Sequence, residues 1–247
     1  MKEVRYFYVP DAATRQELPE EEAQHAVRVL RLTSGDEMVL MDGKGSFHEA
    51  VITGATKKRC CYRIVASHPQ EKAWKGRLHL AMAPTKNMDR TEWTVEKATE
   101  IGFDELTFLR CQFSERTVVK AERVEKILIS AMKQSRKAEK PQQNGMTDFK
   151  TFIESVTSEK SDKYVKNKYI CHCYEEKDLG EKHLLREVLK PGEDALVMIG
   201  PEGDFSVEEV RLALAAGFQP VSLGKARLRT ETAALVAVHL MNLANSI

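Results

Sequence analysis

Two glycine turns near the C-terminus constrain this chain more than any other feature of its sequence. An apolar run at 195–199 breaks into the turn Gly200-Pro201-Glu202-Gly203-Asp204-Phe205, and a second short strand at 221–223 ends at Gly224. In an open parallel sheet, ligands bind beyond the carboxyl ends of the strands, at the turns that follow them. We therefore expect the functional site at these two turns.

Helices are expected on either side of the second turn. Ser206 and Glu209 have the spacing of a capping box, which predicts the start of a helix, and Gly217 suits its C-terminal end. The segment 233–244 is apolar on nearly every face, which predicts a buried helix.

From residue 77 to residue 189 strand patterns alternate with helix patterns. Strands are expected at 77–83, 105–110 and 168–174, and helices at 89–101, 121–138 and 181–189. Asp89 is the expected cap of the first of these helices, and the polar stretch 142–168 is expected to be a surface excursion. The alternation predicts an α/β layer with a mostly parallel sheet.

The first 72 residues follow a different pattern. Short β segments recur between residues 37 and 66, and Asp42-Gly43 is a strong hairpin signal. Several short strands with glycine turns predict a small β-barrel. The polar segment 68–76 is the expected boundary, which gives a barrel domain at 1–72 and an α/β domain at 73–247.

Composition excludes several classes of protein. The net charge is +1, so a nucleic-acid-binding surface would have to be local. The first residues are charged where a signal peptide needs an apolar core, and no apolar run reaches the roughly 18 residues of a membrane span. We expect a cytoplasmic protein that does not associate with membranes.

No metal site is expected. Cys171-His172-Cys173 lies in an expected strand, where successive side chains point to opposite faces, and no second Cys/His pair stands at zinc spacing. The two cysteines are interpreted as buried strand thiols.

The glycine turns do not match the common phosphate-binding motifs. The first turn lacks the Gly-Lys-Ser/Thr ending of a P-loop, and the three glycines of a Rossmann fingerprint are absent. Glu202 and Asp204 place negative charge where a phosphate would bind. The turns therefore favour a cationic or neutral cofactor over a nucleoside triphosphate.

A family resemblance rests on three motifs taken together. Gly200-Pro201-Glu202-Gly203, Leu223-Gly224 and Leu228-Arg229-Thr230-Glu231-Thr232-Ala233 resemble the SPOUT class of methyltransferases and, within it, the RsmE family, which methylates N3 of a uridine in 16S (small-subunit) ribosomal RNA. The resemblance covers essentially the whole chain, including 25–31 before a PUA-like barrel and Lys97-Ala98-Thr99-Glu100-Ile101-Gly102.

This resemblance implies a SPOUT-type α/β fold with a deep trefoil knot, in which the last helix threads under an earlier loop. It implies S-adenosyl-L-methionine as the cofactor, bound in a bent shape at a site completed by a homodimer interface. By family position, the cofactor-binding residues are Ile199, Gly200, Pro201, Gly203, Leu223, Gly224, Leu228 and Thr230.

Two residues are candidates for catalysis. Arg229 cannot be a base, because a guanidinium stays protonated in proteins, but it can stabilise negative charge on O2 or O4 of the uracil ring. Its alternative role is a salt bridge between subunits. Glu231 is the only carboxylate in its motif and the candidate base; from the sequence alone we favour the alternative, a first-turn carboxylate stabilised by the helix dipole.

The candidate RNA contacts are basic residues spread over both expected domains, and their alternative is an ordinary solvated surface. They are Arg28, Arg31, Lys86, Arg116 and Arg136. Two other functions stay open: a SPOUT-class enzyme that methylates a ribose 2′-oxygen or another base, and a non-enzymatic platform that only binds RNA. The glycine turns argue against the platform, which has no use for a cofactor site.

Overall fold

The computed structural model describes residues 5–158 and 166–246. The chain forms two compact units, Met1–Lys72 with Ile129–Lys140, and Ala73–Leu128 with Pro141–Ile247. The segment Ile129–Lys140, which the sequence placed in the second domain, groups with the first unit. Lys133 accounts for part of this difference, because its Nζ lies 2.7 and 2.9 Å from the two carboxylate oxygens of Glu22.

The first unit is built on a four-stranded sheet in the order β1-β2-β3-β4. Its strands are β1 (Tyr6–Tyr8), β2 (Glu37–Met41), β3 (Ser46–Ala55) and β4 (Cys60–Pro69). β1 runs parallel to β2, and the other pairs are antiparallel. A short helix, α1 (Glu20–Gln24), continues into a π-helical turn, η1 (His25–Val29). The expected turn at Asp42-Gly43 connects β2 to β3, and its Asp42 Oδ1 accepts hydrogen bonds from two backbone N–H groups.

The second unit contains a seven-stranded sheet in the order β7-β6-β5-β10-β8-β11-β9, and all neighbouring strands of this sheet within the described residues are parallel. Its strands are β5 (Leu78–Met82), β6 (Glu105–Arg110), β7 (Gln142–Asp148), β8 (Lys168–Cys171), β9 (His183–Leu184), β10 (Ala195–Ile199) and β11 (Gln219–Ser222). The α/β class with a mostly parallel sheet is confirmed. Every residue of β5 and β10 is buried, as expected for central strands covered on both faces.

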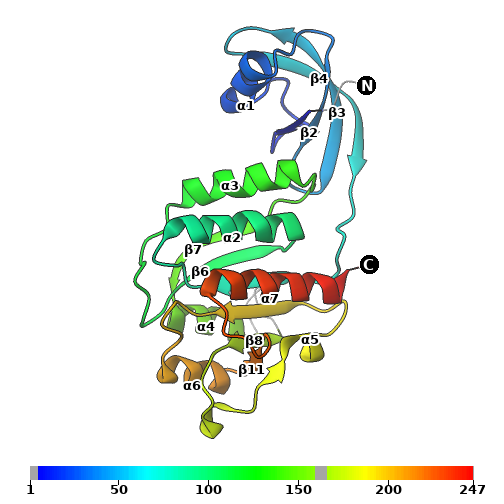
Figure 1. The fold of residues 1–247 in the computed structure, drawn as a ribbon. Helices are drawn as coiled ribbons and strands as arrows, with labels where there is room; N and C mark the ends of the chain where they lie inside the picture. Colours follow the sequence, from blue (N-terminus) through cyan, green and yellow to red (C-terminus); the bar gives the residue numbers. More distant parts are fainter. Residues whose placement is uncertain (1–4, 159–165, 247) are drawn as a thin grey trace. The chain divides into compact units, whose positions relative to one another are not determined.

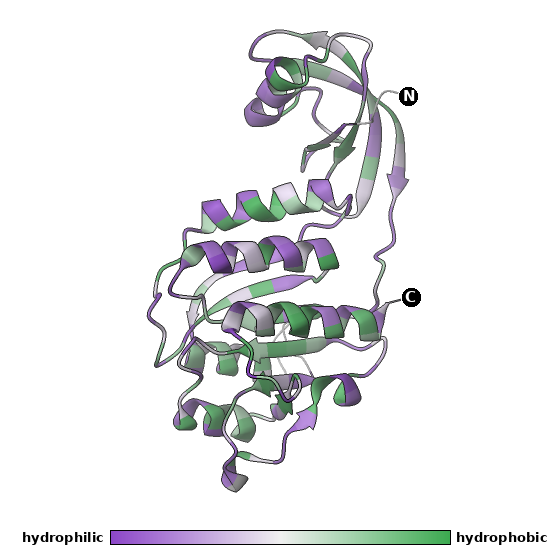
Figure 2. Ribbon diagram, in the orientation of Figure 1, coloured by the Kyte–Doolittle hydropathy of each residue, from purple (hydrophilic) through white to green (hydrophobic). Residues whose placement is uncertain are grey.

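Helices cover both faces of this sheet (Figure 1). They are α2 (Met88–Ile101), α3 (Ala121–Gln134), α4 (Phe149–Thr157), α5 (Leu185–Val188), α6 (Val207–Ala215) and α7 (Thr230–Asn245), with a 3₁₀ turn, η2 (Lys177–Leu179). The apolar residues of α2, α5 and α7 pack in one core cluster, and those of α4 and α6 pack in another. Alternate residues of β10 join each cluster: Val197 faces the first, whereas Leu196 and Met198 face the second. Figure 2 shows the hydrophobic character of α7.

The last helix is tied to the first helix of the same unit. Near the C-terminal end of α7, Asn242 Nδ2 donates a hydrogen bond to the carbonyl oxygen of Gly102 at 3.0 Å, across 140 positions of sequence. Gly102 follows α2 with a φ of 118°, and a Cβ atom there would lie 2.4 Å from the Trp74 ring. Only glycine therefore fits at this junction. The trefoil knot that the resemblance implies stays a prediction.

Several local expectations are confirmed and others are wrong. The capping box of Ser206 and Glu209 is present, with both reciprocal hydrogen bonds. The cap of α2 is Asn87 rather than Asp89, because the Asn87 side chain accepts from the Asp89 N–H group at 3.1 Å. The segment 181–189 forms β9 and a single turn of helix, α5, instead of one helix, because β9 pairs with β11.

The polar stretch 142–168 is not simply a surface excursion. Its first part forms the strand β7 and the helix α4, whereas residues 159–165 lie outside the described residues. The four apolar side chains of α4 are buried and join one of the two cores of the sheet; they are Phe149, Phe152, Ile153 and Val156. These four side chains lie on one face of the helix, so a stretch that is polar overall can still pack against the sheet.

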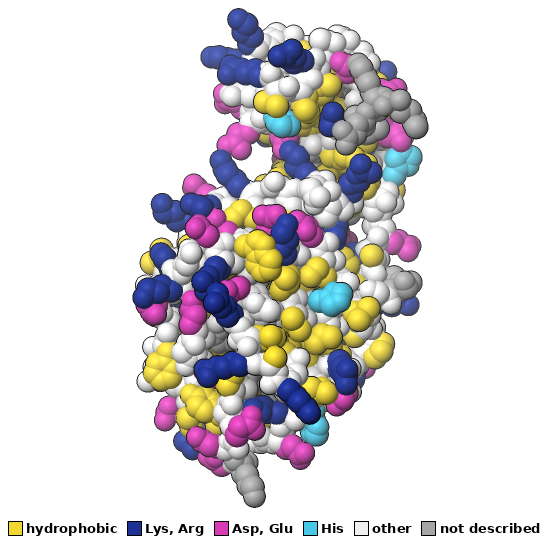
Figure 3. Space-filling model, viewed as in Figure 1, with side chains coloured by type: hydrophobic (Ala, Val, Ile, Leu, Met, Phe, Trp, Pro, Cys, Tyr) yellow, Lys and Arg dark blue, Asp and Glu magenta, His cyan; other side chains and the backbone are white. Residues whose placement is uncertain are grey.

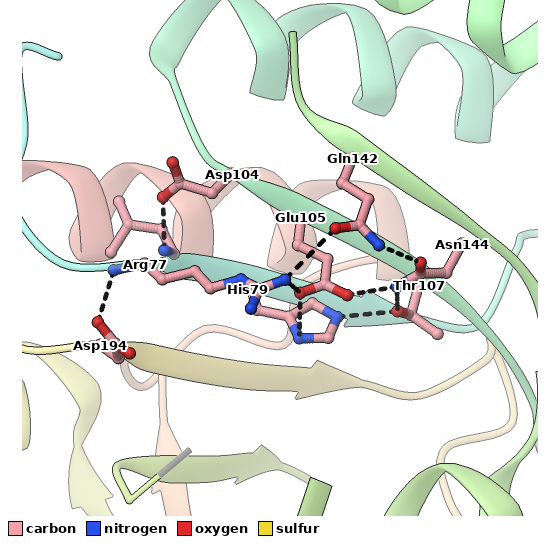
Figure 4. Close-up of polar contacts among 9 residues, drawn as sticks. Arg77, His79, Asp104, Glu105, Thr107, Gln142, Asn144 and Asp194 are labelled. Atoms are coloured by element: carbon pink, nitrogen blue, oxygen red, sulfur yellow. Dashed lines mark hydrogen bonds and ion pairs between the residues drawn. The ribbon is translucent and has the colours of Figure 1, made fainter. Parts of the chain in front are cut away.

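A network of buried polar side chains lies at the amino ends of β5, β6 and β7 (Figure 4). The Glu105 carboxylate lies 2.6 Å from Arg77 Nη2 and accepts a hydrogen bond from Asn144 Nδ2 at 2.5 Å. Thr107 Oγ1 lies 2.8 Å from both Asn144 Nδ2 and His79 Nε2. The second ring nitrogen of His79 lies 3.5 Å from Glu105. Each buried side chain here thus has polar partners within the protein.

Candidate active site at the carboxyl ends of the strands

The opposite end of the same sheet holds a cavity of about 780 Å³. Its walls come from the segments that follow β8, β10 and β11, and from the first turn of α7. These strand ends lie at one level, because Cys171 pairs with both Ile199 and Val221 in the sheet register. The cavity is therefore at the place where parallel sheets bind ligands, and within the usual range of about 300–1,000 Å³ for small-molecule sites.

The turn after β10 is closed tightly and fixed to the end of β8. A Cβ atom on Gly200 would lie 3.0 Å from the backbone nitrogen of Phe205, so the turn leaves no room for a side chain there. Asp204 has a φ of 67°, which is uncommon outside glycine, and its N–H group donates to Pro201 O at 2.9 Å. Asp204 Oδ2 accepts a hydrogen bond from the N–H group of Cys173 at 2.7 Å.

The turn after β11 leads into α7. Gly224 has a φ of 133°, a conformation that favours glycine, and Ser222 Oγ lies 3.2 Å from its backbone nitrogen. The α7 helix begins at Thr230, with Arg229 at its N-cap position. This geometry directs the first turn of α7 into the cavity wall.

The structure brings together most of the cofactor-binding residues that the resemblance implies. The following line the cavity: Ile199, Gly200, Pro201, Leu223, Gly224, Leu228 and Thr230. Gly203 is not part of the cavity wall; a Cβ atom on it would lie 3.2 Å from the Cβ atom of Phe113, so this glycine serves close packing of the turn.

Both catalytic candidates also line the cavity. Arg229 is exposed, and its guanidinium has no hydrogen bond or ion pair within the described ranges. Glu231 is only 8% exposed, and its Oε1 lies 3.5 Å from Nη1 of Arg90. The other carboxylate oxygen, Oε2, has no hydrogen-bond partner among the described residues. The helix position agrees with the dipole interpretation, but the orphaned oxygen is also available to a ligand.

Sequence reasoning missed several side chains of this wall, among them Arg90 and His172. Arg90 lies in α2, far from the glycine turns in sequence, and no local pattern marks it. His172 was placed inside a strand, but β8 ends at Cys171, so His172 is the first residue beyond the carboxyl end. The residue is only 7% exposed, and neither ring nitrogen has a hydrogen-bond partner among the described residues.

The environment of His172 favours its uncharged form. Burial, followed by the charge of Lys182, lowers the pKa of His172 below its ordinary value of 6.5. Burial likewise raises the pKa of the Cys171 thiol. The expectation of two buried strand thiols is wrong for Cys173, which is exposed and lies beyond the end of β8. In the part of the chain that the structure describes, no group of three or more His, Cys, Asp or Glu residues is arranged to hold a metal ion.

The candidate RNA contacts lie in both units. In the first unit, Arg28 and Arg31 are exposed, Arg31 has a φ of 56°, and the Arg136 guanidinium lies 5.3 Å from the centre of the Tyr6 ring. In the second unit, Lys86 Nζ pairs with Glu115 at 2.7 Å, and Arg116 Nη2 donates to the Lys86 carbonyl oxygen. No helix in the described ranges has the length and apolar character needed to cross a membrane.

Comparison with known proteins assigns the family. Residues 72–242 match the RNA methyltransferase domain family, and residues 18–65 match the RNA methyltransferase PUA domain family. The chain belongs to the RNA methyltransferase family. The PUA-like character expected for the first part of the chain is confirmed as well.

Three relatives illustrate how far the likeness extends. This methyltransferase is 42% identical to a probable rRNA-methyltransferase from Porphyromonas gingivalis, with a TM-score of 0.88 and 98% of each chain covered. It is 28% identical, with a TM-score of 0.81 and 98% of each chain covered, to ribosomal RNA small subunit methyltransferase E from Neisseria gonorrhoeae, a structure bound to S-adenosyl methionine. Ribosomal RNA small subunit methyltransferase E from Mycobacterium bovis is 28% identical in an alignment 246 positions long, which covers 94% of this chain and 88% of that protein.

Proposed function

We propose that this methyltransferase transfers a methyl group from S-adenosyl-L-methionine to N3 of a uridine in 16S (small-subunit) ribosomal RNA. One observation carries the proposal: a single cavity collects both glycine turns, the exposed guanidinium of Arg229 and the orphaned carboxylate oxygen of Glu231. The two relatives whose names include small-subunit ribosomal RNA support the choice of substrate.

The residues of the cavity fit this cofactor. S-adenosyl-L-methionine carries a sulfonium cation and an ammonium group, and the wall contains the carboxylates of Glu202, Asp204 and Glu231. The orphaned Oε2 of Glu231 is a buried acceptor that a cationic or hydrogen-bonding ligand would satisfy. Glycine turns without side chains let the backbone approach the adenosine closely. The proposed cofactor contacts line the cavity; they are Ile199, Gly200, Pro201, Leu223, Gly224, Leu228 and Thr230. Gly203, which the resemblance also implies, is proposed to act through the close packing of the turn.

When bound, S-adenosyl-L-methionine supplies an electrophilic methyl group on sulfur and leaves as a neutral thioether. Arg229, at the N-cap of α7, remains protonated and donates hydrogen bonds to O2 or O4 of the uracil ring as negative charge develops there. This stabilisation is needed because the N3 imide is only weakly acidic. A preorganised donor of this type contributes about 10²–10³ in rate.

Glu231 accepts the N3 proton in this proposal. Its Oε2 has no hydrogen-bond partner among the described residues, and its Oε1 lies 3.5 Å from Nη1 of Arg90, a contact that favours this orientation of the carboxylate. Transfer of this proton to Oε2 would leave the electron pair on N3 available to the methyl group that the bound cofactor supplies. A carboxylate is a weak base for an imide, so the step depends on the charge stabilisation that Arg229 provides.

The RNA contacts proposed with this activity are Arg28, Arg31 and Arg136 in the first unit, and Lys86 and Arg116 in the second. Cationic side chains supply the sequence-independent part of RNA affinity through the phosphates. The target base must be unstacked before it enters the cavity, as for other enzymes that act on a base.

We also propose that two copies of the chain form a homodimer through the surface of α2 and α7. Trp93 of α2 is 44% exposed and Leu243 of α7 is 61% exposed. Figure 3 shows hydrophobic side chains gathered over these two helices. An exposed apolar patch of this kind is typical of an interface. The enzyme would act in the cytoplasm, where its RNA substrate is found.

The deciding experiment is nucleoside mass spectrometry of small-subunit ribosomal RNA from a strain that lacks this protein. We expect 3-methyluridine to be lost, and to return with the wild-type chain but not with Arg229→Ala. An unchanged 3-methyluridine level together with loss of a 2′-O-methyl nucleoside or another methylated base would replace the uridine-N3 assignment. No change in any methylated nucleoside would favour the platform that only binds RNA.

A further inference from the structure

His172 occupies a position between the two glycine turns. It follows Cys171, whose register partners are Ile199 on one side and Val221 on the other. The next residues along those two strands are Gly200 and Ser222. The imidazole therefore enters the cavity from the middle of the three strands, where a cofactor held by both turns would meet it.

The backbone around His172 is fixed by specific hydrogen bonds from the turn after β10. The N–H group of Cys173 donates to Asp204 Oδ2 at 2.7 Å, and the Tyr174 hydroxyl donates to the Phe205 carbonyl oxygen at 2.7 Å. The Tyr174 ring also lies near the imidazole, with a centroid distance of 5.9 Å. These contacts give the imidazole a defined place, in the way that binding residues are usually held.

The imidazole itself is left unsatisfied. The residue is 7% exposed, so water reaches it poorly, and neither Nδ1 nor Nε2 has a hydrogen-bond partner among the described residues. An unpaired buried polar group costs about 1–3 kcal/mol. Such a cost is offset when a ligand supplies the missing partner, and His172 lines the cavity where a ligand would bind.

Burial is the main cause that lowers the pKa of His172, and it favours the neutral ring, which offers one donor and one acceptor. Lys182 disfavours a second positive charge nearby, whereas Asp204 and Glu175 act in the opposite direction. Glu175 is itself paired with Lys182 at 2.9 Å, and Asp204 is engaged by the Cys173 N–H group. A neutral ring is also the form that a cationic cofactor tolerates beside it.

We propose that the imidazole of His172 hydrogen-bonds directly to S-adenosyl-L-methionine and is part of the cofactor site. The inference rests on the proposed function, because it assumes that this cavity binds that cofactor. The cofactor site would then be formed by the ends of three strands: β8, which leads to His172, and β10 and β11, which lead to the two glycine turns.

Isothermal titration calorimetry with S-adenosyl-L-methionine tests the contact directly, without turnover. His172→Phe fills a similar volume without polar atoms, and we expect its Kd to rise about tenfold, as for the loss of one hydrogen bond in a buried site. His172→Gln keeps a donor and an acceptor, and its Kd should stay within about threefold of the wild type. His68→Phe, at an exposed histidine of the first unit, is the control and should bind as the wild type does.

A second measurement uses the unmodified chain. In ¹⁵N spectra of the imidazole groups, addition of the cofactor should shift the His172 ring nitrogens, with the His68 signals unchanged. A His172→Phe variant that melts and binds as the wild type does, or His172 signals that ignore the cofactor, would overturn the inference. If the wild-type chain itself shows no binding of S-adenosyl-L-methionine, the proposed function fails first.

Discussion

Two buried histidines lie at opposite ends of one sheet and differ in their hydrogen bonding. His79, at the amino end of β5, is 3% exposed and has polar partners at both ring nitrogens. His172, just beyond the carboxyl end of β8, is 7% exposed and has none among the described residues. The two rings are thus similarly buried, but only the ring of His79 has a hydrogen-bond partner within the described residues.

The difference separates structure from function within the sheet. At the amino end, Glu105, Thr107 and Asn144 satisfy one another and His79, as Figure 4 shows, so the network needs no ligand. At the carboxyl end, the side chains of His172 and Glu231 line a cavity, and their unpaired atoms can form hydrogen bonds with a ligand. Buried polar groups that are fully paired stabilise the fold, whereas unpaired ones that line a cavity are candidates for contact with a ligand.

The largest effect should come from removing a charge at the carboxyl end. Arg229→Ala is expected to lower kcat/KM for methyl transfer about 10²–10³-fold, because it removes the donor to the developing anion. The Kd for S-adenosyl-L-methionine and the melting temperature should stay near the wild-type values, since Arg229 is exposed. Arg211→Ala, which removes an exposed arginine of α6, is the control. Equal activity in both variants would contradict the role of Arg229.

The next largest effect should come from the polar network at the amino ends of β5, β6 and β7, and it should be a loss of folding stability. Glu105→Ala removes the acceptor of Arg77 and Asn144 and is expected to lower the free energy of unfolding by about 3 kcal/mol, as for other broken buried pairs. Asp148→Ala breaks an exposed pair with Arg110 and should cost far less, because solvent screens the two charges. Urea unfolding measures both. A similar small loss for the two variants would show that the buried network does not stabilise the sheet.

A smaller effect is expected at Asp204, which joins the turn after β10 to the loop that carries His172. Asp204→Ala loses the acceptor for the Cys173 N–H group and places alanine at a φ of 67°, at an expected cost of about 2 kcal/mol. Asp204→Asn keeps an acceptor and tolerates this conformation, so it should cost clearly less. Urea unfolding compares the two variants, and identical losses would contradict the role of the side-chain oxygen.

The smallest effect concerns pH. The pKa of His172 is lowered in the folded protein, so between that pKa and the ordinary 6.5 the unfolded chain binds more protons than the folded one. Stability should therefore fall as the pH is lowered through 6.5, and this part of the loss should be absent in His172→Gln. Unfolding free energies at pH 7.5 and 5.5 measure it; an equal pH dependence in both proteins would contradict the lowered pKa.

The sequence predicted elements whose signals are local. The strand β6 has the expected bounds of 105–110, and Ser206 with Glu209 caps α6 as expected. The two glycine turns were correctly placed at one site, because parallel strands end at the same edge of a sheet. Residues of both turns line one cavity, together with Arg229 and Glu231.

Features that depend on distant pairing could not be predicted in this way. The end of β8 at Cys171 follows from its register with β10 and β11, and only that end turns His172 from a strand residue into a cavity residue. Arg90 reaches Glu231 from α2, across more than half of the chain. The breakdown of 181–189 into β9 and α5 follows from the pairing of β9 with β11.

The hydrogen bond between Asn242 and Gly102 has a consequence for how the active site is assembled in time. It joins residues 140 positions apart, and α7, which carries it, also supplies Glu231 to the cavity. The central strand β10 must likewise insert between β5 and β8, which lie far from each other in sequence. Contacts of such long range are slow to form, because the chain entropy of large loops is lost before the contacts stabilise it. Catalytic competence is therefore expected to be among the last properties that a newly folding molecule acquires.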